Sequence, residues 1–183
     1  MEKCDHELVE AFVKAVGNSL SSLKSTHDEQ FYYYAFVFDS GLHPYISAWS
    51  YEALEKSMCE NEIVEEDEKN WWKWDYADSP YVVYGYEEFF GEVNELLDQR
   101  AEGLSEEALY GREWNIRIAS MEEAMKRLDR TGFFGTGSER KNVVVNVEAA
   151  PPDGEEYDRA LRLNPGSPLL DEYLNCCEEP DSD

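Results

Sequence analysis

"FYYYAFVF", residues 31–38, is the stretch that decides the fold of this chain. Every residue in it is apolar or aromatic, so neither side of the segment offers a polar face to water. Such a run, followed by the turn sequence "DSG" at 39–41, is typical of a strand that is buried on both faces. We therefore expect a strand at the centre of the core, covered on both sides.

The segments next to this strand continue the fold. Before it, Asp5 is a suitable N-cap for an amphipathic helix. The apolar face of that helix consists of Leu8, Phe12, Val16, Leu20 and Leu23. After the turn, "HPYISAW" at 43–49 predicts a returning strand, and Ser50 can cap a short helix that runs to about Cys59.

Further helices are predicted beyond residue 85. A helical pattern resumes at Tyr86 and ends near Gly103, and a short helix follows from Ser105. "EWNIRIA", residues 113–119, is compatible with either a strand or a helix. These patterns place most of the middle of the chain in helices.

The strongest local helix signal is "SMEEAMKRLDRTG", residues 120–132. Ser120 and Glu123 have the spacing of a capping box, and Gly132 follows the last turn. "NVVVNV" at 142–147 then predicts a strand. Two more helices are expected, one near residues 155–163 and one that begins at Ser167-Pro168.

Few strands, more numerous helices and one hairpin predict an α+β fold with a small antiparallel sheet flanked by several helices. The length of 183 residues suits one domain, which we expect to span residues 1–177. Residues 178–183 are predicted to form an acidic disordered tail.

A second segment, residues 60–86, mixes side chains that ordinary loops and ordinary cores keep apart. It holds eight acidic residues together with three of the five tryptophans of the chain. Tryptophan and tyrosine dominate binding hot spots, and carboxylates steer cationic partners. We therefore predict a partner-binding surface. Its residues are Glu62, Glu65, Glu66, Asp67, Glu68, Trp71, Trp72, Trp74, Asp75, Tyr76 and Asp78.

An alternative remains open for the tryptophans. They could fold inward as a flap of the core, with "EIVEEDEK" at 62–69 as a solvated loop. The sequence "WWKW" at 71–74 directs its side chains in opposite directions in either regular structure. We therefore expect one ring to be buried and another to be exposed.

The net charge of −25 is the strongest global property of the chain. It repels nucleic-acid phosphates and anionic membranes, so neither is expected as a direct partner, whereas a basic protein is attracted. The simpler interpretation is that the charge only aids solubility. Residues 100–141 contain eight basic and eight acidic residues, so the net charge resides in the rest of the chain.

Catalytic signatures are not found in the sequence. The three histidines, His6, His27 and His43, lack metal-ligand spacing, so no metal, cofactor or catalytic residue is predicted. The glycines of "GFFGTGSERK", residues 132–141, follow a helix and precede a strand, the reverse of a phosphate-binding loop. This segment therefore predicts a helix stop and a turn.

The spacing of the four cysteines indicates no disulfide framework. The chain has no apolar run of the roughly 20 residues that are needed to span a bilayer. Its N-terminus, "MEKCDHELVE", has no apolar signal core. We therefore expect a cytoplasmic location.

Several landmarks together resemble an uncharacterised bacterial family found among the immunity proteins of polymorphic toxin systems. They are "FYYYAFVFDSG" at 31–41, "SYEALEK" at 50–56, "WKWDYADSPY" at 72–81, "AMKRLDRTGFFG" at 124–135, "NVVVNV" at 142–147 and "RLNP" at 162–165. The resemblance covers most of residues 5–175 and implies an α+β cytoplasmic domain that neutralises a toxin encoded beside it. It implies no catalytic residues.

Our first functional hypothesis is therefore an immunity-type protein, not an enzyme, that binds a basic cognate toxin through the acidic and aromatic segment. A toxin that attacks nucleic acid would itself be basic, since it must bind phosphate. The alternative is an enzyme or small-ligand domain that uses His43 or binds an anion through Arg112, Arg117 and Arg140. A third hypothesis is an acidic adapter or nucleic-acid mimic. The oligomeric state is left open.

Overall fold

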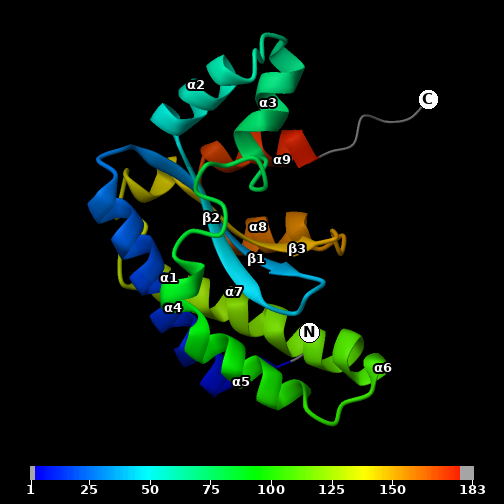
Figure 1. Cartoon of the computed structure of the whole chain (residues 1–183). Helices are drawn as coiled ribbons and strands as arrows, with labels where there is room; N and C mark the ends of the chain where they lie inside the picture. Colours follow the sequence, from blue (N-terminus) through cyan, green and yellow to red (C-terminus); the bar gives the residue numbers. More distant parts are fainter. Residues whose placement is uncertain (1–2, 178–183) are drawn as a thin grey trace, which may run out of the picture.

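β1 (Phe31–Asp39) is the middle strand of a three-stranded sheet in the computed structural model, which describes residues 3–177 (Figure 1). β2 (Pro44–Ser50) pairs with β1 in antiparallel register, with Phe38 opposite Pro44. β3 (Val144–Ala150) lies on the other side of β1 and pairs with it in parallel. The predicted α+β class and the predicted hairpin are confirmed.

The sheet is small and flanked by helices, as predicted, but it is mixed: the β1–β2 pair is antiparallel as expected, whereas β3 runs parallel to β1. β1 and β2 are joined by a short turn, which forces them to run in opposite directions. β3 is reached only after the chain has passed through several helices, and so long a crossover lets a strand return in parallel. The sequence of a strand alone does not determine whether it pairs in parallel or antiparallel with its neighbour.

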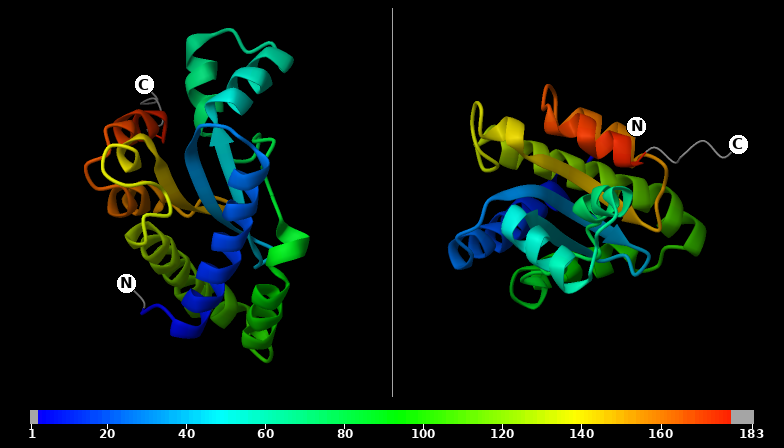
Figure 2. Two further views of the ribbon diagram at one scale, coloured as in Figure 1. Left: turned by 90° about the vertical axis from the view of Figure 1, so that its left-hand side faces the viewer. Right: turned by 90° about the horizontal axis from the view of Figure 1, so that it is seen from above.

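Helices surround the sheet on both faces (Figure 2). They are α1 (His6–Thr26), α2 (Tyr51–Glu60), α3 (Glu66–Trp74), α4 (Tyr86–Phe89), α5 (Gly91–Ala101), α6 (Glu106–Ala108), α7 (Trp114–Arg130), α8 (Glu156–Leu163) and α9 (Leu169–Cys177). A π-helical turn, η1 (Leu109–Glu113), leads directly into α7, and a 3-10 turn, η2 (Arg140–Asn142), precedes β3.

One face of β1 packs against α1 and α7. The ring of Phe36 packs edge-to-face on Phe12 of α1, with centroids 5.3 Å apart, and Phe38 packs on Trp114 of α7 at 4.6 Å. These rings are close enough for aromatic pairing in addition to the burial of their surface.

The other face of β1 packs against α3 and α9. Tyr33 meets Trp74 of α3 at 5.5 Å and Tyr173 of α9 at 5.7 Å between ring centroids. Tyr32 contacts Trp74 as well, although neighbouring strand residues normally point to opposite faces. A register shift between Phe31 and Tyr33 explains the exception, because a bulge turns the extra side chain to the same side. β1 is therefore covered on both sides, as its composition predicts.

The first helix follows its sequence signals closely. The Asp5 side chain accepts hydrogen bonds from the backbone N–H groups of Glu7 and Leu8, and all five predicted apolar positions are buried. Backbone groups at the start of a helix have no partner inside it, so this carboxylate satisfies two of them. The predicted N-cap is confirmed.

The predicted start of the helix at residue 120 is wrong. α7 begins at Trp114, so Ser120 lies inside the helix, and "EWNIRIA" is helical throughout, with Glu113 in the π-helical turn η1 and the rest in α7. Ser120 Oγ donates to the carbonyl of Ile116 one turn earlier and accepts from the backbone N–H of Asp5. The serine therefore ties α1 to α7 and caps nothing. Gly132 does end the helix, with a φ of +78°.

α2 and α3 lie side by side and project beyond one end of the sheet (Figures 1 and 2). The turn between them contains Glu62, whose backbone has a φ of +57°, and Ile63, which is buried. We refer to residues 51–74 as the acidic arm. It contains eight acidic residues and three lysines, a net charge of −5.

The described cysteine side chains, Cys4, Cys59 and Cys176, are free thiols. The predicted acidic tail, residues 178–183, lies outside the described residues.

Candidate functional site

Side chains from the sheet hold the segment that follows α3 in place. Trp49 Nε1 donates to the carbonyl of Asp75 at 2.7 Å, and Ser47 Oγ donates to the carbonyl of Tyr76 at 2.7 Å. The hydroxyl of Tyr32 donates to the carbonyl of Lys73, also at 2.7 Å. Three donors from β1 and β2 thus bind three backbone carbonyls within residues 73–76, where α3 ends. They position the base of the acidic arm over the end of the sheet.

Five of the predicted partner-binding acids are exposed on the acidic arm. They are Glu62, Glu65, Glu66, Asp67 and Glu68. Glu65 is the N-cap residue of α3, and the next three acids form its first turn, where negative charge is favoured by the helix dipole. The predicted loop at 62–69 is therefore correct only up to Glu65, because α3 begins at Glu66.

The three tryptophans of α3 differ in environment, as expected for "WWKW". Trp74 is 6% exposed and lies against the sheet, whereas Trp71 is 52% exposed. Trp72 is half-buried, and its Nε1 donates to Ser57 Oγ of α2 at 3.1 Å. One ring thus belongs to the core, one joins the two helices of the arm, and one faces solvent.

The remaining predicted residues lie at the base of the arm. Asp75 is half-buried and accepts from the backbone N–H of Ala77 at 2.7 Å. Tyr76 is half-buried, and burial raises the pKa of its hydroxyl, with further contributions from nearby groups that include Glu148 and Asp75. Asp78 is exposed.

A groove of about 420 Å³ opens beside these residues, and it contains a carboxylate that the sequence reasoning missed. We call it the Glu148 groove. Its lining residues are Trp71, Trp74, Asp75, Tyr76, Ala77, Glu148, Pro152, Tyr173 and Cys176. It brings together the end of α3, the end of β3 and α9, which are far apart in the sequence.

Glu148 is held by three hydrogen bonds from side chains of β1, β3 and α9. The hydroxyls of Tyr33 and Tyr173 donate to its Oε1 at 2.6 and 2.7 Å, and Asn146 Nδ2 donates at 2.9 Å. Burial raises the pKa of the Glu148 carboxyl, while these three donors and the charge of Arg159 act in the opposite direction. Burying a carboxylate is costly unless hydrogen bonds or a counterion compensate it, and these three donors supply part of that compensation.

A sequence signal for Glu148 does exist. Asn146 and Glu148 are the polar residues in a strand that is otherwise apolar, and they are two positions apart. Side chains at that spacing share one face of a strand, so the pair marks a polar patch on one side. They pair with the small residues Ala35 and Val37 on β1, which leave room for the patch.

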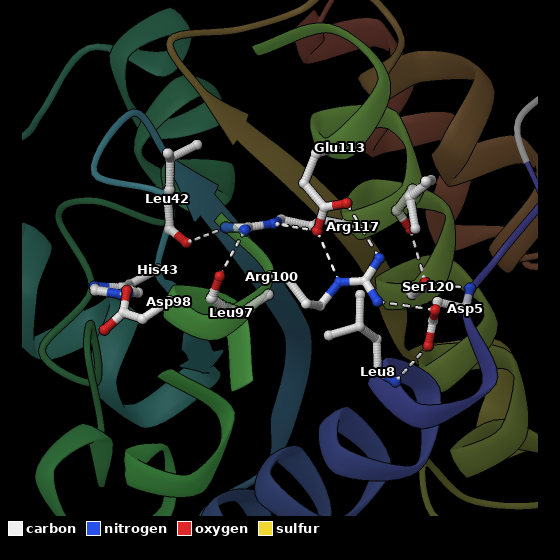
Figure 3. A network of polar contacts seen from close by, with 11 residues as sticks. Asp5, Leu8, Leu42, His43, Leu97, Asp98, Arg100, Glu113, Arg117 and Ser120 are labelled. Carbon is white, nitrogen blue, oxygen red and sulfur yellow. Dashed lines mark hydrogen bonds and ion pairs between the residues drawn. The ribbon is translucent and has the colours of Figure 1, made fainter. Parts of the chain in front are cut away.

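Two of the three arginines considered for anion binding are held by internal acceptors. Arg117 is buried and donates to Glu113 and to the carbonyls of Leu42 and Leu97 (Figure 3). Arg140 donates to Asp129 and to the carbonyls of Val143 and Leu163, among others. Neither guanidinium is therefore presented to an external anion. Arg112 is exposed on η1 and takes no part in these two sets of hydrogen bonds.

The network around Glu113 is structural. Glu113 receives Arg100 of α5 at 2.8 and 3.1 Å and Arg117 of α7 at 3.1 Å, and Arg100 also reaches Asp5 at the start of α1 (Figure 3). Two acids and two arginines balance each other in charge. His43 lies nearby and pairs with Asp98 at 2.9 Å (Figure 3).

A second groove, of about 510 Å³, lies between α7 and α8, and most of its charged groups are paired internally. Glu122 binds Lys126 and Arg162, and Arg159 binds Asp153. A ligand would have to displace these ion pairs. Within residues 3–177, no three histidine, cysteine or carboxylate side chains are grouped so that they could hold a metal ion.

The fold and the groove define the class as an acidic α+β protein with a mixed sheet, a projecting helical arm and an aromatic groove at its base. The chain belongs to the family described as Domain of unknown function (DUF4303), whose model matches residues 9–165. No curated protein and no solved structure matches the chain. No helix among residues 3–177 is both long enough and apolar enough to cross a bilayer.

Proposed function

We propose that this protein is an immunity-type protein that binds and neutralises a basic cognate toxin through the acidic arm. The observation that carries the proposal is the set of five exposed carboxylates on the arm, placed next to the exposed ring of Trp71. Carboxylates of this kind attract lysines and arginines and accelerate encounter, while an exposed tryptophan supplies apolar contact area.

The position of the arm supports the proposal. α2 and α3 project from the body, so a partner could contact both helices without deforming the sheet (Figure 1). Trp72 braces the pair through Ser57, and Lys73 Nζ pairs with Glu172 of α9 at 2.5 Å. A rigid surface loses less conformational entropy on binding than a mobile loop would.

The first experiment is co-expression of this chain with the product of the adjacent reading frame, scored by growth and by co-purification. The proposal predicts that growth is rescued and that a stable complex is isolated. Rescue without a complex would overturn direct blocking in favour of an enzyme that reverses damage. Absence of rescue would overturn the toxin–immunity relation for that pair.

A matched set of variants then tests the acidic arm. Replacing Glu65, Glu66 and Asp67 by Gln, Gln and Asn should slow association roughly tenfold at low salt and reduce its salt dependence. Replacing the exposed acids Glu87, Glu88 and Glu92 in the same way removes equal charge from another surface. The arm is not the binding surface if both sets slow association equally.

A further inference from the structure

The Glu148 groove is lined by rings held at fixed angles. Trp74 packs edge-to-face on Tyr173, with centroids 5.4 Å apart and planes at 85°, and on Tyr33, at 5.5 Å and 82°. Trp74 and Tyr173 are buried, while Trp71 stands exposed at the rim. Such a wall is preformed, so a ligand would not have to order it.

The charge of the groove has a single sign. Its lining contains two carboxylates, Asp75 and Glu148, and no lysine, arginine or histidine. The cation that acts on Glu148 is Arg159, whose guanidinium is already paired with Asp153 and Glu156 at 2.8 and 3.4 Å. Lys73 Nζ lies 5.1 Å from the centroid of the Trp74 ring and is paired with Glu172. Carboxylates and aromatic faces both attract cations, and here they line the same space.

We infer that the Glu148 groove receives one arginine side chain of the basic partner, with Glu148 as its counterion. This inference rests on the proposed function and names the chemistry of the anchor. A guanidinium is planar and weakly hydrated, so it stacks on tryptophan and tyrosine faces and pairs with a carboxylate more readily than an ammonium does. The hydrogen bonds from Tyr33, Asn146 and Tyr173 described above end on Oε1 of Glu148, and the arginine would pair with this same carboxylate.

Position supports the same occupant. Trp71 lies on α3 at the rim of the groove and one or two turns from the exposed acids of the arm. A basic surface drawn to those acids would arrive with its side chains beside the groove. One buried arginine anchor surrounded by weaker exposed ion pairs is the usual distribution of energy in an interface.

The test uses the full chain and N-acetyl-arginine amide as the probe, followed by NMR shifts of the indole N–H groups and by calorimetry. The matched control is N-acetyl-citrulline amide, which has the same shape without the charge. We expect the arginine compound to bind at least tenfold more tightly and to shift the signals of Trp71 and Trp74. Equal affinity for the two compounds would overturn the inference.

Two variants locate the site. Glu148→Gln keeps the shape and the hydrogen-bond acceptor but removes the charge, and it should abolish the preference for arginine over citrulline. Asp171→Asn removes one charge from an exposed position on α9 and should leave that preference unchanged. If E148Q proves poorly folded by circular dichroism, Trp71→Ala, which alters only the exposed rim, should weaken arginine binding severalfold. An unaltered preference in a folded E148Q, or an unaltered affinity for the arginine compound in W71A, contradicts the inference.

The outcomes separate the inference from the proposed function. If the adjacent toxin binds through the acidic arm but neither the arginine compound nor E148Q has an effect, the groove is not the anchor site and the proposed function stands. If the arginine compound binds in the groove but no toxin is neutralised, the result supports the cation site and contradicts the immunity function.

Discussion

Trp71 and Trp74 lie three residues apart on one helix, yet they have different roles. Trp74 is 6% exposed and contacts Tyr32, Tyr33 and Tyr173, whereas Trp71 is 52% exposed and touches Trp72. The loss of stability on truncating a side chain depends on its contacts and its burial, so two residues of the same type can differ widely. Variants at the two positions should therefore separate stability from binding.

Trp74→Ala should lower the free energy of unfolding by about 3–5 kcal/mol, because it removes a large ring from a packed site. Trp71→Ala should change that free energy by less than about 0.5 kcal/mol, since its ring is largely in water. Urea denaturation of both variants provides the measurement. Similar losses of unfolding free energy in the two variants would contradict the burial of Trp74 and the exposure of Trp71 described here.

Glu148 should make stability depend on pH. Its pKa in the folded protein is raised above the ordinary value of 4.5. Between the ordinary pKa of the unfolded chain and the raised pKa of the folded protein, Glu148 keeps a proton in the folded state that it has lost in the unfolded state. The free energy of unfolding therefore falls as pH rises between these two pKa values. Below 4.5 the contribution of the neutral acid is fully present.

Glu148→Gln removes this titration. The free energy of unfolding of E148Q, relative to the natural chain, should therefore increase as pH rises from 4.5 through the raised pKa of Glu148 in the folded protein. Urea titrations of both proteins across that range measure the difference and cancel the effects of the other acids. A difference that stays flat or declines with pH would argue against a raised pKa.

At the scale of elements, Glu113 joins three helices. It lies in η1, a π-helical turn, which directs its carboxylate between Arg100 of α5 and Arg117 of α7. Arg100 continues the link to Asp5 at the start of α1. Arg117 is almost completely buried, so its charge depends on this carboxylate and on two backbone carbonyls.

Glu113→Ala should lower the free energy of unfolding by about 3–5 kcal/mol, because it leaves a buried guanidinium without its counterion. Glu106→Ala removes an exposed acid from the neighbouring α6 and should cost less than about 0.5 kcal/mol. Thermal and urea unfolding of both variants test the expectation. A loss below about 1 kcal/mol for E113A would mean that the network contributes little.

At the scale of the whole molecule, the net charge of −25 acts on stability and on association in opposite directions. Like charges repel within the folded protein, so salt should stabilise it. Attraction to a basic partner is screened by the same ions, so salt should slow binding.

Raising NaCl from about 10 mM to about 300 mM should therefore increase the melting temperature by a few degrees and lower the association rate with a basic partner at least tenfold. Calorimetry and stopped-flow fluorescence measure the two effects on the same samples. A melting temperature that falls with salt would indicate that the internal ion pairs outweigh the repulsion.

Local patterns in the sequence were enough to locate β1, α1 and the hairpin, and to predict that one ring of "WWKW" is buried and another exposed, although not which ring is which. Each of these depends on neighbours within a few residues: a run of rings, helical spacing from Leu8 to Leu23, or the opposite directions of side chains in "WWKW". The start of α7 was misplaced because Ser120 and Glu123 form a local capping pattern that tertiary packing overrides.

The sequence by itself determined that the chain folds around an aromatic strand, that it is strongly acidic, and that its acids and tryptophans gather in one segment. Only the tertiary structure decided that β3 runs parallel, that Arg117 is an internal group, and that Glu148 lies beneath the rings of the arm. The physical reason is separation along the chain. Periodicity reports only on neighbours, whereas the groove joins residues 71–77, 148 and 173–176, which meet only when α3, β3 and α9 pack together.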